Sequence, residues 1–197
     1  MSQFPITGLA DCVYTKFYCE ENIWKLCDIV SQKTPELLDH LCVIFISNDS
    51  KKVVMFNQRA TVEDDEVVVW DYHVIALFTQ MVDGKPCHSI YDMDTKLPFP
   101  CALEKYVLET FKPDMVLRPG FERLLKVIKA REFLDRFASD RSHMIKDDGS
   151  WLATPPAYPC ICTKDSKMNL DDYMNMTPGI GDVYTVSNFM GHFGLPV

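Results

Sequence analysis

Residues 18–26 of the chain read Tyr-Cys-Glu-Glu-Asn-Ile-Trp-Lys-Leu, and they place a cysteine where a helical pattern begins. From Ile23 to Val30 apolar residues recur at steps of three and four, which predicts a helix from about residue 20 to about residue 31. Cys19 then stands at the helix N-terminus, where unpaired N–H groups and the helix dipole favour a thiolate over a thiol. A thiolate is a nucleophile, so this segment predicts a cysteine enzyme that needs an acid–base partner.

The best partner for this cysteine is His73, which lies in the strongest strand pattern of the chain. Residues 67–78 read Val-Val-Val-Trp-Asp-Tyr-His-Val-Ile-Ala-Leu-Phe, and this run predicts a central strand. Residues of the same parity share a face of a strand, so Asp71 and His73 are expected on one face. Trp70, Tyr72 and Val74 are then expected on the other.

The group that orients the histidine is expected on the next strand, residues 88–94, which contains two aspartates. A two-residue turn at Asp83-Gly84 places Asp94 opposite His73, whereas a four-residue loop over residues 81–84 places Asp92 there. Both lengths occur in hairpins, so spacing leaves the two aspartates as alternatives. Either carboxylate would fix the tautomer of the imidazole and stabilise its charged form, as a Cys–His–Asp hydrolase requires.

The remaining patterns predict an α/β chain of the α+β type. Strands are expected at residues 42–47 and 52–56 as a hairpin, and helices at residues 103–111, 121–137 and about 186–193. No internal repeat or flexible linker divides residues 1–197. We therefore expect a single catalytic domain with a central, largely antiparallel sheet flanked by helices.

Composition narrows the class of partner. The net charge is −8 and no basic patch stands out, so we expect no nucleic-acid partner. No apolar run approaches 18 residues and no secretory signal is recognisable, so we expect no membrane partner and a cytoplasmic location. In such a location the eight cysteines are expected to be free thiols. A domain of this size without an exposed apolar helix is expected to be a monomer.

Six segments of the chain closely resemble the protein N-terminal glutamine amidohydrolase family, in the same order and from about residue 11 to about residue 193. They are residues 12–14, 18–27, 70–74, 91–100, 137–144 and 166–170. The resemblance implies an α/β fold related to transglutaminases and papain-like cysteine hydrolases. Carried over motif by motif, it implies a triad of Cys19, His73 and Asp92, which favours the four-residue loop.

The resemblance also implies a reaction. The enzyme would deamidate the N-terminal glutamine of a protein or peptide to glutamate through a thioester, release ammonia, and need no metal or organic cofactor. The product would pass to the arginyl-transfer machinery of the N-degron pathway, in the cytoplasm and also the nucleus. Recognition of a free α-ammonium calls for a carboxylate. The candidate substrate-binding residues are Tyr18, Glu20, Trp70, Asp71 and Asp140, with Glu21 as a further carboxylate.

Two other classes of function compete with this interpretation. A cysteine protease or a transglutaminase would use the same triad on an internal peptide bond or an amine acceptor. A metal-binding interaction module would use Cys12, Cys160, Cys162 and His143. The spacing Cys-Ile-Cys is poor for a structural zinc site, which argues against this module.

Overall fold

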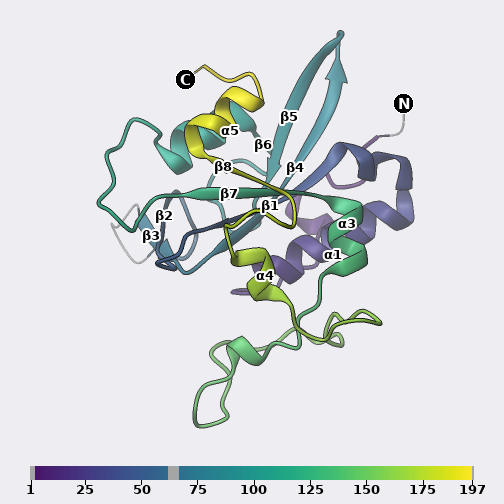
Figure 1. Ribbon diagram of the computed structural model, residues 1–197. Helices are drawn as coiled ribbons and strands as arrows, with labels where there is room; N and C mark the ends of the chain where they lie inside the picture. Colours follow the sequence, from purple (N-terminus) through teal and green to yellow (C-terminus); the bar gives the residue numbers. More distant parts are fainter. Residues whose placement is uncertain (1–2, 62–66, 197) are drawn as a thin grey trace.

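Six strands form the central sheet of the computed structural model, which describes residues 3–61 and 67–196 (Figure 1). All neighbouring strands are antiparallel, in the order β6-β5-β4-β1-β7-β8. The strands are β1 (Leu41–Ser47), β4 (His73–Val82), β5 (Lys85–Tyr91), β6 (Cys101–Ala102), β7 (Leu124–Lys129) and β8 (Asp182–Thr185). The expected α+β fold with a largely antiparallel sheet is confirmed.

Helices cover both faces of this sheet (Figure 1). On one face lie α1 (Cys19–Lys33), α3 (Ala130–Arg136) and α4 (Leu170–Met174). On the other lie α2 (Leu103–Tyr106), the π-helical turn η3 (Val107–Phe111) and α5 (Val186–His192). Short 3-10 turns are η1 (Leu9–Asp11), η2 (Pro35–His40) and η4 (Ser142–Met144). The helices expected from residues 20, 103 and 186 onward are confirmed. No helix in the described residues is long and apolar enough to cross a membrane.

The central strand β1 shows why two helical layers form. Val43 and Phe45 pack into the core beneath α1, while Ile44 and Ile46 pack into the core beneath α2 and α5. Successive side chains of a strand point to opposite faces, so a strand that is apolar at every position needs cover on both. This arrangement buries most of β1 and the first six residues of β4, which begins with His73.

The expected single strand over residues 67–78 is wrong. The structure contains two strands, β3 (Val67–Trp70) and β4, and β3 pairs with β2 (Val53–Phe56) in a separate two-stranded sheet. The break falls at Asp71, whose carboxylate accepts a hydrogen bond from the Tyr72 N–H at 3.0 Å. A short acidic side chain that binds the local backbone competes with the ladder of a strand. The expected hairpin of residues 42–47 with 52–56 is also wrong. β1 pairs with β4 and β7, whereas β2 pairs with β3.

The expected helix over residues 121–137 is only partly present. Residues Leu124–Lys129 form β7, and the helix α3 begins at Ala130. A short apolar run fits a strand as well as a helix, and here pairing along the whole of β1 selects the strand.

Candidate functional site

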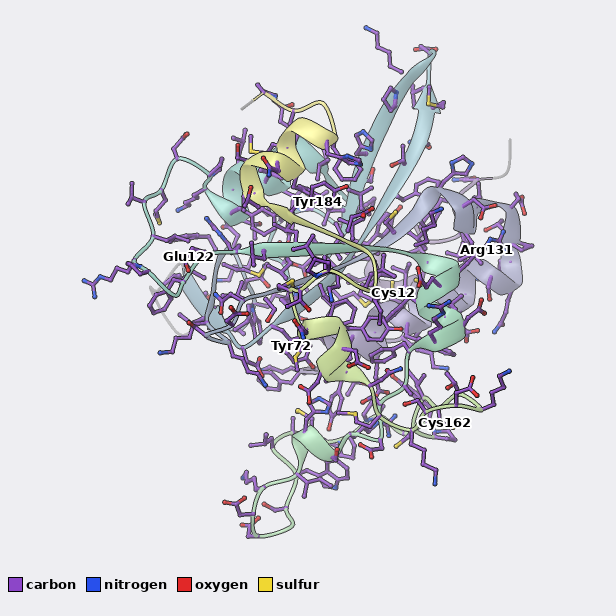
Figure 2. All side chains as sticks on the ribbon, viewed as in Figure 1. Cys12, Tyr72, Glu122, Arg131, Cys162 and Tyr184 are labelled. Carbon is purple, nitrogen blue, oxygen red and sulfur yellow. The ribbon has the colours of Figure 1, made fainter. Side chains whose placement is uncertain are left out.

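A cavity of about 550 Å³ lies where α1, the β3–β4 break and the loop after β5 meet. The side chains that line it come from segments far apart in the sequence. They are Phe17, Cys19, Lys51, Trp70, Asp71, Tyr72, His73, Asp94, His143, Met144, Leu152, Ala153, Met168, Leu170, Asp171 and Met174. Tyr72, labelled in Figure 2, lines this cavity together with residues of α4. The cavity therefore joins the predicted nucleophile and the predicted base.

Cys19 is the first residue of α1, as the sequence predicts. The turn before it is held by Asn22, whose side-chain oxygen accepts from the Thr15 N–H at 2.8 Å while its amide donates to the Thr15 carbonyl at 2.9 Å. These two bonds hold the turn that leads into α1, and the thiol at its start lies near the second residue of β4, Val74.

The expected thiolate is not favoured by the surroundings of Cys19. Burial raises the pKa of the thiol well above its usual value, and the carboxylates of Glu20 and Asp94 raise it further. The Val74 backbone N–H acts in the opposite direction. Burial outweighs the helix dipole here, because transfer of an anion out of water costs more than the dipole returns. The sulfur is therefore a thiol that needs a base.

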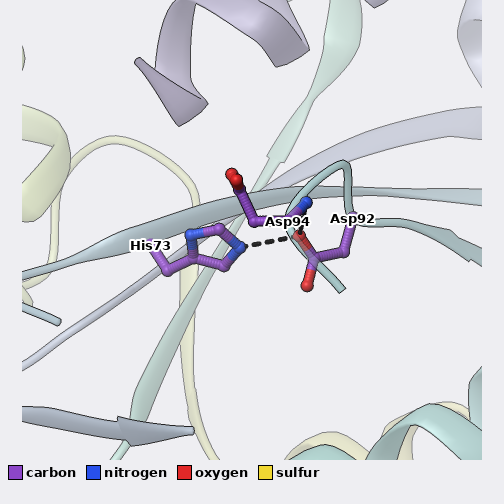
Figure 3. Close-up of side chains that lie close together, drawn as sticks. All are labelled: His73, Asp92 and Asp94. Carbon is purple, nitrogen blue, oxygen red and sulfur yellow. Dashed lines mark hydrogen bonds and ion pairs between the residues drawn. The ribbon is translucent and has the colours of Figure 1, made fainter. Parts of the chain in front are cut away.

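His73 and Asp92 form a buried pair in which Nε2 and Oδ1 lie 2.8 Å apart (Figure 3). Burial disfavours the charged imidazole, but the charge and hydrogen bond of Asp92 outweigh it and raise the pKa of His73. The other ring nitrogen, Nδ1, is buried and has no hydrogen-bond partner. The imidazole thus has one nitrogen held by a carboxylate and one available in a wall that also contains Cys19.

Asp92 is held by donors on every side. Its Oδ2 accepts from the Gln58 amide at 3.0 Å and from the Tyr106 hydroxyl at 2.8 Å, and its Oδ1 accepts from the Asp94 N–H at 2.9 Å. Burial alone would raise the pKa of Asp92, but His73 and these donors lower it. The carboxylate is therefore ionised and fixed in orientation. Gln58 and Tyr106 carried no signal in the sequence that linked them to the site.

The hairpin register expected from the resemblance is wrong, although the aspartate is the one it named. Val82 pairs with Lys85 across a two-residue turn in which Asp83 and Gly84 have positive φ angles of 50° and 75°. In that register Asp94 would face His73. Asp92 makes the contact instead, because β5 ends at Tyr91 and the chain turns, as the Asp94 N–H bond back to Asp92 shows (Figure 3).

Trp70 also lies where strand parity did not place it. Its ring stacks on the His73 ring with centroids 5.4 Å apart and an angle of 15° between the planes. Parity fails because the strand ends between the two residues. The indole shields one face of the imidazole from water and fixes its plane.

Asp94 also lies near His73 in the cavity wall, and its carboxylate accepts a hydrogen bond from the Tyr14 hydroxyl at 2.6 Å. Burial raises the pKa of its carboxyl. One donor atom from each of His73, Asp92 and Asp94 lies within 4.8 Å of the others, a set that has the chemistry of a metal site. The 2.8 Å bond between His73 and Asp92 already occupies two of those atoms.

The metal ligands considered from the sequence are not brought together. Among the residues that the structure describes, Cys12, Cys160, Cys162 and His143 form no group with ligand atoms in such proximity. Every described cysteine is a free thiol.

Of the candidate substrate-binding residues, Trp70 and Asp71 line the cavity. Tyr18 is fully buried and donates its hydroxyl to the Ala153 carbonyl at 3.2 Å. Asp140 is exposed and accepts from the Ser142 N–H at 2.9 Å, so it braces a turn. Glu20 is fully buried behind the cavity wall.

Glu21 is excluded by a different contact. It forms a bidentate ion pair with Arg141, with distances of 2.7 and 2.8 Å, and both side chains are buried. The pair ties the first turn of α1 to the loop that carries His143.

The chain is similar to known proteins along most of its length. A family model described as N-terminal glutamine amidase matches residues 14–193. A protein N-terminal glutamine amidohydrolase of Danio rerio is 48% identical over 186 residues, which cover 93% of this chain and 90% of that protein. The protein of the same name from Homo sapiens is 47% identical, covering 93% and 88%, and that from Drosophila mojavensis is 42% identical, covering 98% and 93%. A half-buried thiol and a histidine–carboxylate pair in one cavity, together with similarity along almost the whole chain, place this protein in the N-terminal glutamine amidase family.

Proposed function

We propose that this protein hydrolyses the side-chain carboxamide of an N-terminal glutamine in proteins and peptides, giving glutamate and ammonia. The observation that carries the proposal is the buried His73–Asp92 pair, whose free nitrogen lies in the cavity wall with Cys19. The names of the relatives supply the substrate, and the cavity supplies a nucleophile, a base and an orienting carboxylate.

In the first half of the reaction His73 takes the proton of the Cys19 thiol at Nδ1. The sulfur forms a bond to the carboxamide carbon, and the carbonyl electrons move to oxygen. The tetrahedral intermediate then collapses, the C–N bond breaks, and His73 returns the proton to nitrogen so that ammonia leaves. Because the resting thiol has a raised pKa, proton transfer to His73 is required for attack. Asp92 stabilises the imidazolium that forms.

In the second half a water molecule attacks the thioester. His73 removes a proton from this water, the C–S bond breaks, and the proton returns to sulfur, which regenerates the thiol and leaves a glutamate side chain. Each half of the reaction passes through a tetrahedral intermediate that carries an oxyanion. The N–H groups of the first turn of α1, including that of Cys19, have no helical carbonyl to bind and are the natural donors to it.

The pathway and the cellular location of this reaction are part of the same proposal, and the family resemblance alone supports them. The product, a chain with N-terminal glutamate, would be consumed by arginyl transfer in the N-degron pathway. We expect the protein to act as a monomer in the cytoplasm and nucleus, without a metal or organic cofactor.

The test is mass spectrometry of a synthetic peptide that begins with glutamine, with Cys19→Ala as the matched control. Ammonia release and a gain of about one dalton, absent with Cys19→Ala and with the N-acetylated peptide, are expected. Cleavage of the chain would instead indicate a protease, and coupling to an added amine would indicate a transglutaminase. Modification of internal glutamine would contradict the selectivity for the N-terminus.

A further inference from the structure

Glu20 is a buried carboxylate whose surroundings in the free protein are incomplete. Its side chain has no exposed surface. Oε2 accepts a hydrogen bond from the Tyr72 hydroxyl at 2.9 Å and lies 3.7 Å from Cys19 Sγ. Oε1 is buried and has no hydrogen-bond partner. An unpaired carboxylate oxygen inside a protein is costly, so its retention beside the nucleophile calls for a cationic partner.

Two other potential acceptors lie beside the Glu20 carboxylate. His143 Nε2 lies 3.7 Å from Glu20 Oε1 and 3.5 Å from the Tyr72 hydroxyl. Both separations exceed the 2.7–2.9 Å of a good charge-assisted hydrogen bond. The Tyr72 proton is already given to Glu20, so the hydroxyl oxygen is left to accept. Burial lowers the pKa of His143, which leaves its imidazole neutral with one nitrogen able to accept.

A group with three donors fits among these atoms. An ammonium carries three N–H bonds. His143 Nε2 lies 3.5 Å from the Tyr72 hydroxyl and 3.7 Å from Glu20 Oε1, and one nitrogen about 2.9 Å from both atoms can bridge either separation. Tyr72 and His143 line the cavity, so these atoms are reached from the same space as Cys19. The α-nitrogen of glutamine is four bonds from its carboxamide carbon. Glu20 follows Cys19 directly and its Oε2 lies 3.7 Å from the Cys19 Sγ, so an ammonium bound at Glu20 keeps the carboxamide near the nucleophile.

We propose that Glu20, Tyr72 and His143 form the binding site for the α-ammonium of the substrate, with Glu20 as its counter-ion. This inference rests on the proposed function and adds the residues that select an N-terminal glutamine over an internal one. A peptide bond in place of the ammonium would leave Glu20 without a cation and would offer a single N–H.

The other cavity carboxylates are less suited to this role. Asp71 is exposed, so water screens its charge. Asp94 is bound by the Tyr14 hydroxyl and lies beside His73. Asp171 lies 3.9 Å from Lys51, which supplies it with a cation. Of these four carboxylates, Glu20 is the one with a buried oxygen that has no hydrogen-bond partner.

The test separates binding from turnover. It uses Cys19→Ala, which lacks the nucleophile, and two peptides of identical sequence. One begins with glutamine, and the other begins with a 4-carbamoylbutanoyl group, which is glutamine without its α-amine. Calorimetry is expected to show that Cys19→Ala binds the amine peptide at least about 30-fold more tightly. Adding Glu20→Gln is expected to bring the two affinities within about threefold.

Matched variants keep the result interpretable. Asp71→Asn in the Cys19→Ala protein also removes one cavity carboxylate, and it is expected to preserve the preference for the amine peptide. Tyr72→Phe retains Glu20 but loses one acceptor, and it is expected to reduce the preference about tenfold. If the Glu20 variant fails to fold by circular dichroism, Tyr72→Phe carries the test.

Ammonia release by the intact enzyme from the amine peptide is measured in parallel. Binding without release would contradict the proposed reaction but support the ammonium site. Full preference after Glu20→Gln, loss of preference in Asp71→Asn, or equal affinity of Cys19→Ala for both peptides would overturn the inference.

Discussion

At the scale of single residues, the site depends on how each titratable group is surrounded. Asp92 is buried yet ionised, because Gln58, Tyr106 and His73 all donate to it. Cys19 is half-buried with no such donors beyond the Val74 N–H, and the raised pKa of its thiol means that the proton is retained. The surroundings raise the pKa of the Cys19 thiol and of the His73 imidazole. The thiol therefore keeps its proton until it attacks the substrate, and His73 is then able to accept that proton.

Asp92→Asn is expected to retain the fold and lower kcat/KM by a factor on the order of 10³ to 10⁴. The amide no longer stabilises the imidazolium, and the pKa of His73 should fall because Asp92 is what raises it. Kinetics of ammonia release and NMR titration of His73 measure the two effects. Near-normal turnover would shift the orienting role to Asp94.

At the scale of elements, the cavity is assembled from segments joined by buried polar contacts. Asn22 holds the turn before α1, and the Glu21–Arg141 pair holds α1 against the loop that leads to η4. Arg141 also donates to the carbonyls of Pro156 and Tyr158 at 3.2 and 3.1 Å. In Figure 1 this loop extends away from the sheet, so these contacts are what bring His143 to the cavity wall.

Arg141→Met is expected to cost about 3–5 kcal/mol in the free energy of unfolding, because Glu21 is left buried without a cation. Urea denaturation monitored by circular dichroism measures the loss. Combining it with Glu21→Gln should recover part of the stability. Arg131→Met is the matched control, since its ion pair with Asp39 is exposed and screened by water, so its loss should be much smaller. Equal losses in the two variants would contradict a structural role for the buried pair.

At the scale of the whole molecule, two apolar cores on either side of one sheet support several buried ionisable groups. These groups make the stability of the fold depend on pH. The pKa of Glu20 is raised from 4.5 to about 7, chiefly by burial. The folded state therefore binds a proton that the unfolded state has released, between those two values. The stability due to this proton is fully present below pH 4.5 and is lost as pH rises through about 7.

The free energy of unfolding should consequently fall between pH 4.5 and 7 more steeply in the native protein than in Glu20→Gln. From the shift in pKa, the difference is on the order of 3 kcal/mol. Urea denaturation at a series of pH values measures both curves. Glu104→Gln, at an exposed position, controls for loss of one carboxylate. Parallel curves for the native protein and Glu20→Gln would refute a raised pKa at Glu20.

The sequence by itself determined the features that depend on neighbours along the chain. The start of α1 at Cys19 and the helix from Leu103 follow from local periodicity. The residue types at Asp83-Gly84 indicated the position of a turn but left its length open. Only the tertiary structure decided which distant segments pair. Periodicity indicates which face of an element is buried, but it does not indicate which other segment covers that face.

That limit explains each departure. The apolar run that begins at Val67 forms strands of two different sheets, because Asp71 interrupts it. Asp92 reaches His73 from beyond the end of β5, outside any ladder register. Glu20 is buried among groups from two other segments, because Tyr72 donates to its Oε2 and His143 lies 3.7 Å from its unpaired Oε1. Burial of polar groups is a property of the assembled fold, and the chemistry of this site rests on it.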